Sequence, residues 1–183
     1  DYIDFYLLHS LDRGSWIKLR DLGVMQWAEG ALADGRIKHL GFSFHDELSV
    51  FKEIVDYYDA WEFAQIQYNL LNEEVQAGTE GLLYAADRGL AVVVMEPLLG
   101  GRLAKPPKAI REMLGDSRTP VDWALQWLWD KPEVSTVLSG MSTMEQVEQN
   151  LVSASRSGAG SLSGADRDLL KRVQAKYSEL NPV

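Results

Sequence analysis

Residues 90–95, Leu-Ala-Val-Val-Val-Met, form the stretch that most clearly indicates how this chain folds. The run is short, continuous and rich in β-branched side chains, which is typical of a parallel strand covered by helices. Gly89 precedes it and is expected to end a helix that opens at Thr79. A glycine-rich, basic loop follows at residues 96–105, EPLLGGRLAK.

The same alternation of strand and helix extends in both directions from this stretch. Four further strands are predicted at residues 1–9, 37–44, 63–69 and 134–138. Amphipathic helical patterns cover residues 24–32, 48–58, 79–89, 110–114, 120–128, 142–154 and 169–177. Residues 11–20 are polar and irregular, and we expect them to form a loop after the first strand.

Five strands that alternate with helices predict an α/β fold with a parallel sheet. Right-handed crossovers leave two architectures, an open doubly wound sheet or a barrel, and five units are too few to close an eight-stranded barrel. We expect residues 1–183 to form one such domain, in which a Gly/Ser-rich linker at residues 155–164 leads to the final helix. A buried-type strand at the very start suggests that the chain begins in the middle of a larger fold.

Composition excludes several functional classes. The net charge of -9 is spread along the chain, which argues against nucleic acid or an anionic membrane as a partner. Cysteine is absent, so a disulfide or a cysteine-ligated metal is excluded, and we name no metal-ligating residue. No apolar run approaches the roughly 20 residues needed to cross a bilayer. We expect no leader before the first strand, and we expect a soluble, cytoplasmic protein.

Polar side chains stand at the ends of three predicted strands, where parallel sheets open into ligand sites. His9 ends the first strand, although an isolated histidine is often a satisfied core or loop residue. Ser43 and Gln65 lie on the next two strands and could hold a planar amide through complementary donors and acceptors. Gln65 and Asn69 could equally satisfy backbone groups of a loop.

Two later segments could bind an anion. Residues 138–142 lead from a strand through Gly140 into a helix that a capping box between Ser142 and Glu145 is predicted to start. The free N–H groups and the dipole of that helix start attract negative charge. The loop at residues 99–105 combines two glycines with Arg102 and Lys105. A solvated basic loop is the alternative for this second segment.

In combination, five stretches resemble the aldo/keto reductase family, in family order and over nearly the whole chain. They are DYIDFYLLH (1–9), GRIKHLGFSF (35–44), QIQYNLL (65–71), EPLLGGRL (96–103) and VLSGMSTMEQVEQNL (137–151). The resemblance implies an eight-stranded (β/α) TIM barrel, of which this chain would supply strands 4 to 8 and a C-terminal helix. It also implies reversible hydride transfer between NADP or NAD and an aldehyde or ketone.

The family pattern assigns a role to individual residues of this chain. His9 matches the active-site histidine that helps to polarise the substrate carbonyl, and Ser43 and Gln65 match residues that hold the nicotinamide carboxamide. Met95 stands where an aromatic residue usually stacks on the nicotinamide, and a thioether can also pack on a ring. The pyrophosphate loop would include Leu98, Gly100 and Arg102. The adenosine end would include Gly140, Ser142, Gln146, Gln149 and Asn150.

The chain also departs from the family pattern. Phe44 replaces the asparagine that usually follows the serine, and Glu96 occupies a position that is often serine. The basic residues that usually hold a 2′-phosphate are absent at Gly140 and Gln146, so NADP and NAD both remain open. The stretches GFSFHD, YNLLNEE and MEPLLGG and the end at residues 180–183, LNPV, resemble a bacterial branch that carries a ferredoxin-like iron-sulfur segment. That segment would have to lie outside this cysteine-free chain.

The sequence therefore predicts a carbonyl-reducing, NAD(P)-dependent oxidoreductase as the intact parent. The family's tyrosine acid, lysine and aspartate would precede residue 1, so we expect this stretch alone to be inactive. A non-catalytic regulatory module that binds the dinucleotide is the alternative. The expected partners are a small carbonyl substrate and either the missing N-terminal half of the barrel or a second copy of this chain, because the first strand has a free edge.

Overall fold

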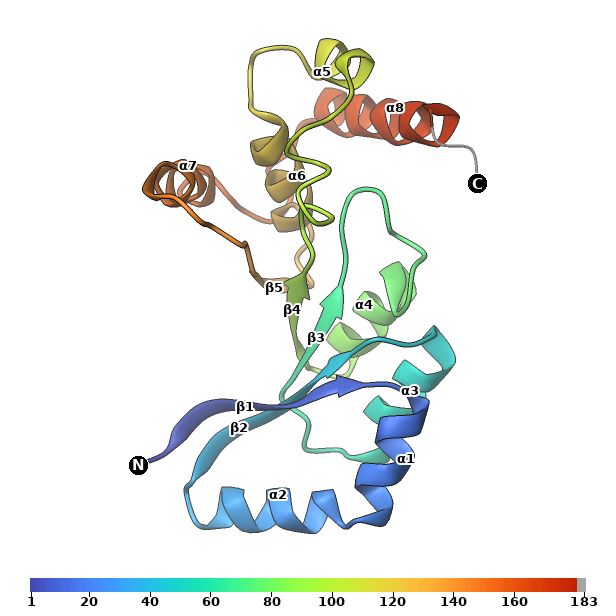
Figure 1. Cartoon of the computed structure of the whole chain (residues 1–183), viewed down its shortest axis with the longest axis vertical. Helices are drawn as coiled ribbons and strands as arrows, with labels where there is room; N and C mark the ends of the chain where they lie inside the picture. Colours follow the sequence, from blue (N-terminus) through green and yellow to red (C-terminus); the bar gives the residue numbers. More distant parts are fainter. Residues whose placement is uncertain (181–183) are drawn as a thin grey trace. The chain divides into compact units, whose positions relative to one another are not determined.

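The computed structural model describes residues 1–180, which contain five strands and eight helices (Figure 1). The strands are β1 (Ile3–Leu11), β2 (Ile37–Phe44), β3 (Phe63–Gln67), β4 (Ala91–Met95) and β5 (Val134–Val137). The helices are α1 (Arg13–Asp21), α2 (Val24–Ala33), α3 (Leu48–Tyr57), α4 (Gly78–Asp87), α5 (Lys108–Leu114), α6 (Pro120–Trp129), α7 (Met144–Ala154) and α8 (Gly164–Leu180). All five predicted strands are present.

The chain forms two compact units. Unit 1 contains residues 1–68 and 74–95, and unit 2 contains residues 69–73 and 96–183. The expectation of a single barrel domain stays a prediction. No helix among residues 1–180 is long and apolar enough to span a membrane.

The sheet of unit 1 is parallel and follows the order of the sequence. β1 pairs with β2, β2 with β3, and β3 with β4. The register aligns Leu7 with Gly41, Gly41 with Phe63, and Phe63 with Ala91. Sequential parallel pairing through helical crossovers is the arrangement that repeated βα units require.

One face of this sheet packs against helices and forms the core of unit 1. The rings of Phe42 and Phe44 on β2 lie 5.8 Å and 5.1 Å from Phe51 of α3. Tyr6 of β1 lies 5.4 Å from Trp27 of α2. Figure 1 shows these helices along one side of the strands. α4 ends as predicted at a left-handed glycine, Gly89 (φ 80°), and α2 ends in the same way at Gly35 (φ 71°).

The prediction of a loop at residues 11–20 is wrong, because residues 13–21 form α1. Asp12 caps this helix in a capping box with Ser15, whose backbone N–H and hydroxyl hold the pKa of Asp12 below its usual value. Trp16 alone is buried, with its ring 5.0 Å from that of Tyr57. A helix that buries one residue leaves no apolar periodicity, so the pattern could not predict it.

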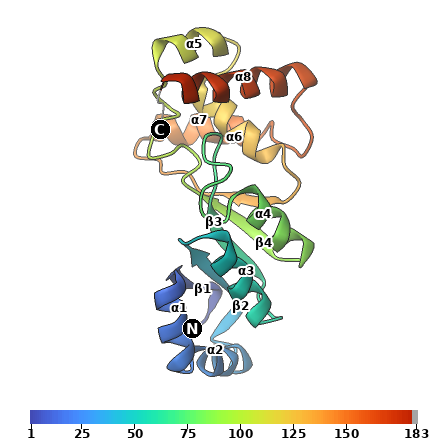
Figure 2. The ribbon, with the colours of Figure 1, turned by 90° about the vertical axis from the view of Figure 1, so that its right-hand side faces the viewer.

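Unit 2 joins its helices through a buried polar cluster. The carboxylate of Asp122 on α6 accepts from the Ser153 hydroxyl of α7 and from Arg156 at 3.2 Å. The Gln126 amide also donates to the Ser153 carbonyl at 2.8 Å. Because these bonds satisfy buried polar atoms of two helices, they fix α6 against α7. In the same unit α5 lies alongside α8 (Figure 2).

The start of α7 differs in detail from the prediction. The sequence suggested a capping box between Ser142 and Glu145, but the N-cap is Thr143, whose hydroxyl accepts from the Gln146 N–H at 3.3 Å. The Gln146 side chain accepts from the Ser142 N–H at 2.7 Å. The N-cap of α7 therefore lies one residue later than predicted, and the Gln146 side chain of the helix bonds back to the loop before it.

Candidate active site and dinucleotide site

One face of the unit 1 sheet lies away from the helices, and polar side chains are found at one end of that face. Side chains alternate along a strand, so Phe5, Leu7 and His9 share one face of β1, opposite Tyr6, which packs on α2. The same alternation places Ser43 opposite Phe42 and Phe44 on β2. Register then aligns Ser43 with Gln65 across the β2–β3 ladder. His9, Ser43 and Gln65 thus lie on the same face near the carboxyl ends of three neighbouring strands.

Ser43 is buried and is tied to β1. Its hydroxyl oxygen accepts from the Ser10 N–H at 2.6 Å, across an irregularity in the β1–β2 register between Leu8 and Leu11. Ser10 has a φ of 56°, in the left-handed region that a serine rarely adopts. Having accepted this bond, the Ser43 hydroxyl still has its own proton to donate.

Gln65 and Met95 contact each other on the same face. The Gln65 amide nitrogen lies 3.4 Å from the Met95 sulfur, a weak acceptor. Ala64 and Ile66, on either side of Gln65, are buried on the helix face. The contact directs the Gln65 nitrogen to Met95 and leaves its carbonyl oxygen as an acceptor for a ligand.

An aromatic layer lies next to these polar residues, towards the amino ends of the strands. Phe5 stacks on His39 at 4.6 Å and meets Phe63 edge-on at 5.8 Å. Gly41 makes room for this layer, since a Cβ there would lie 2.4 Å from the Phe63 carbonyl oxygen. Aromatic rings therefore border the polar side chains on this face of the sheet.

This arrangement fits a planar carboxamide. A serine hydroxyl can donate to the amide oxygen while a glutamine oxygen accepts from the amide nitrogen, and no charged group is required. The Met95 thioether beside Gln65 can pack on an aromatic ring. The residues present therefore suit a nicotinamide, with the His9 imidazole on the same face.

The glycine-rich loop of unit 2 is held by Asn69 and Glu96. Asn69 is fully buried, and its side chain donates to the Glu96 carbonyl at 3.0 Å while it accepts from the N–H groups of Leu71 and Asn72 at 3.1 Å. The Glu96 carboxylate accepts from the Gly100 N–H at 2.8 Å. Of the residues predicted here, Leu98 is half-buried, and Gly100 and Arg102 are exposed.

The predicted adenosine-end residues lie on the loop after β5 and on α7, also in unit 2. Gly140 and Ser142 are in the loop. On α7, Gln149 donates to Glu145 at 3.0 Å, and Asn150 donates to the Ser139 hydroxyl at 3.0 Å. With Gln146 accepting from the Ser142 N–H, each of the three side chains bonds to a different group near the helix start.

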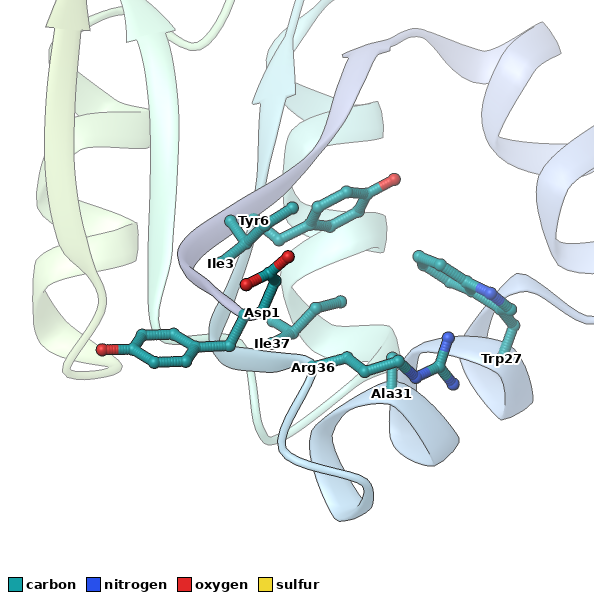
Figure 3. A pocket seen from close by; sticks show the side chains of 8 residues that line it. Asp1, Ile3, Tyr6, Trp27, Ala31, Arg36 and Ile37 are labelled. Carbon is teal, nitrogen blue, oxygen red and sulfur yellow. The ribbon is translucent and has the colours of Figure 1, made fainter.

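A separate hollow lies at the amino end of β1 (Figure 3). It has a volume of about 330 Å³, and its lining includes Tyr6, Trp27, Arg36 and Ile37. Ligands of parallel α/β sheets bind at the carboxyl ends of the strands, so this hollow lies at the wrong end for the predicted chemistry.

Comparison with known proteins identifies the family of this chain. The model of the aldo/keto reductase family matches residues 1–157. The chain belongs to the aldo/keto reductase family. An oxidoreductase of Schizosaccharomyces pombe described as uncharacterized is 28% identical over 157 residues, which cover 83% of this chain and 47% of that protein.

Solved aldo/keto reductases share the fold of this chain. A Bacillus halodurans aldo-keto reductase in its holo form superposes with a TM-score of 0.78 at 24% identity, covering 94% of this chain and 59% of that one. An aldo/keto reductase of Klebsiella pneumoniae in complex with NADP and acetate gives a TM-score of 0.71 at 23% identity, covering 95% and 59%. The α/β fold of this chain therefore matches part of an aldo/keto reductase (β/α)8 barrel. The chain spans about half the length of its curated relative.

One residue that shapes the site was missed in the sequence. Ser10 follows His9 directly, but its backbone bond to Ser43 depends on an irregular register that no sequence pattern records. For Asn69 the alternative role predicted above is confirmed, because its side chain satisfies loop backbone groups at Glu96, Leu71 and Asn72.

Proposed function

We propose that this chain provides the nicotinamide-dinucleotide side of an oxidoreductase that reduces aldehydes or ketones. The observation that carries the proposal is the alignment of Ser43 with Gln65 on the face that also carries His9. Membership of the aldo/keto reductase family and the NADP complex of the Klebsiella pneumoniae relative support it.

In this proposal each residue has a distinct role. Ser43 donates to the carboxamide oxygen and Gln65 accepts from the carboxamide nitrogen, which together fix the ring plane, while Met95 packs on the ring. The bound nicotinamide supplies the hydride. The His9 imidazole donates a hydrogen bond to the substrate carbonyl oxygen and stabilises the negative charge that develops there.

Binding is tested by titrating the intact protein with NADPH and NADH and following nucleotide fluorescence. We expect a saturable change that weakens in Gln65→Leu, which removes the amide acceptor. Gln174→Leu is the comparison, because that glutamine bonds to Leu70 and Glu73 of unit 2. Failure of both nucleotides to bind would refute the proposal.

Turnover separates an enzyme from a regulatory module. Reduction of a generic aldehyde by the intact protein should fall by about 100-fold or more in His9→Ala, because a preorganised donor to the developing oxyanion is lost. His45→Ala removes another exposed imidazole and should keep the rate. Dinucleotide binding without turnover of any aldehyde would instead favour the non-catalytic module.

A further inference from the structure

Most backbone N–H groups of the glycine-rich loop form hydrogen bonds within the loop itself. Five of the six consecutive N–H groups from Leu99 to Ala104 donate to carbonyls of the same loop. These bonds run from Leu99 to Glu96 (3.1 Å), Gly101 to Leu98 (3.0 Å), Arg102 to Leu99 (3.1 Å), Leu103 to Leu98 (3.1 Å) and Ala104 to Gly101 (3.1 Å). Freeing any of these donors requires a change of backbone conformation.

The sixth donor differs from the others. The Gly100 N–H donates to a side chain, the carboxylate of Glu96, at 2.8 Å. Rotation of that side chain alone would release the N–H, because the backbone bonds on either side do not involve the carboxylate. Glu96 and Gly100 are both exposed, so a ligand can approach this donor from solvent.

The backbone of Glu96 is held in the conformation that permits this contact. Its φ is 56°, an unusual value for a residue with a long side chain, and the buried Asn69 amide donates to its carbonyl at 3.0 Å. Leu99, Gly100 and Gly101 also have positive φ values of 49°, 59° and 87°. The loop is thus a tight turn that presents the Gly100 N–H to a negative charge, and the charge present is the protein's own carboxylate.

We propose that the Glu96 carboxylate is an internal competitor for a phosphate of the dinucleotide at the Gly100 N–H, and that it sets the affinity of the protein for the cofactor. The inference rests on the proposed function, because it takes residues 98–102 to be the pyrophosphate loop. A phosphate that binds there displaces Glu96 from Gly100 and meets the repulsion of a nearby like charge.

Two substitutions at this position separate charge from hydrogen bonding. Glu96→Gln keeps a side-chain oxygen at the position that accepts from Gly100 but removes the charge, and Glu96→Ser removes the charge together with the carboxylate oxygens that accept from Gly100. The ligands are NADPH, ADP-ribose, which has a pyrophosphate, and adenosine, which has no phosphate, all measured by calorimetry at low ionic strength. Glu112→Gln on α5 is the control, because it removes a carboxylate of unit 2 that pairs with Lys108 instead of with the loop.

Removal of the carboxylate should tighten the binding of ADP-ribose and NADPH. We expect a gain of about three- to tenfold for Glu96→Gln, the size of a partly screened contact between like charges, and at least as much for Glu96→Ser. The gain should shrink as salt is added. Adenosine binding and the Glu112→Gln variant should be unchanged.

The outcomes distinguish this inference from the proposed function. If the unchanged protein binds NADPH, and Glu96→Gln binds ADP-ribose equally or more weakly, the competitor role is refuted while the proposed function stands. If neither nucleotide binds to any form of the protein, both fail. Should Glu96→Ser unfold, Glu96→Gln decides the question alone, because it retains the acceptor that the loop uses.

Discussion

The backbone N–H of Ser10 donates to the side-chain oxygen of Ser43 at 2.6 Å. This bond lies where the β1–β2 register becomes irregular, directly after His9. It replaces a ladder bond, so the end of β1 is held by a side chain of the neighbouring strand. The residue proposed to bind the nicotinamide therefore also positions the backbone next to the residue proposed to polarise the substrate.

Removing the Ser43 hydroxyl should affect both stability and binding. Ser43→Ala leaves the partly buried Ser10 N–H without its acceptor, and we expect a loss of about 1 to 3 kcal/mol in the free energy of unfolding. NADPH affinity should fall as well. Urea denaturation measures the first effect, and Ser49→Ala, which removes an exposed hydroxyl bonded to Glu47, should change stability little. An unchanged urea midpoint for Ser43→Ala would contradict the role of this bond.

A methyl group at Gly41 should disrupt the aromatic layer. Its Cβ would lie 2.4 Å from the Phe63 carbonyl oxygen and 2.6 Å from the Phe63 ring. We expect Gly41→Ala to destabilise unit 1 by about 1 to 3 kcal/mol or more, because neither the strand nor the packed ring can move freely. Gly30→Ala on α2 meets nothing within 4 Å and should be neutral or stabilising by up to about 1 kcal/mol. Gly41→Ala should therefore lower the unfolding temperature while Gly30→Ala leaves it unchanged or raises it, and equal shifts would argue against the clash.

Asp130 should make stability depend on pH in the acid range. Burial acts to raise the pKa of Asp130, but bonds from Arg167 at 2.9 Å and from the Leu162 N–H at 2.9 Å outweigh it, so the pKa lies below its ordinary value. A carboxyl whose pKa is lower in the folded state stabilises the protein above the unfolded pKa. This contribution is lost as the pH falls through the folded value.

Asp130→Asn should therefore lower the free energy of unfolding at pH 7 by about 1 to 2 kcal/mol. The difference from the unchanged protein should shrink as the pH falls from about 5 to about 3. Urea midpoints measured across this range check the prediction. Asp168→Asn, at an exposed position on α8 beside Arg167, is the comparison. A difference in unfolding free energy between Asp130→Asn and the unchanged protein that stays constant with pH would show that the loss of stability comes from the lost hydrogen bonds and not from the charge.

The edge strand β1 exposes apolar side chains, and we propose that this strand mediates self-association of the chain. Ile3 is 50% exposed and Phe5 is 66% exposed, on the strand that ends the unit 1 sheet. Ile3→Lys should lower the average mass in sedimentation velocity at high concentration, because a charge on an edge strand opposes pairing. Ile17→Lys, at a 40% exposed position on α1, should not. A protein that sediments as a monomer at every concentration would rule out this proposal.

Most of the regular elements could be predicted from the sequence. The continuous β-branched run at residues 90–95 indicated a buried strand, and Gly89 indicated where the preceding helix ends. Helix α1 could not be predicted, because Trp16 is its only buried residue. The cap of α7 was placed one residue early, because Ser142 and Thr143 are equally good candidates and only the backbone geometry selects Thr143.

By itself, the sequence determined the βα order, the resemblance to aldo/keto reductases and the choice of His9, Ser43 and Gln65 as candidates. These follow from local patterns, since the hydrophobic period and the residue types at strand ends are written in consecutive positions. Only the tertiary structure decided which of these polar groups meet. The strand register places Ser43 beside Gln65. An irregularity in the β1–β2 register brings the Ser10 N–H to Ser43. A left-handed turn directs the Glu96 carboxylate to the Gly100 N–H. Register and left-handed turns depend on contacts between distant residues or on backbone angles, which a residue pattern does not encode.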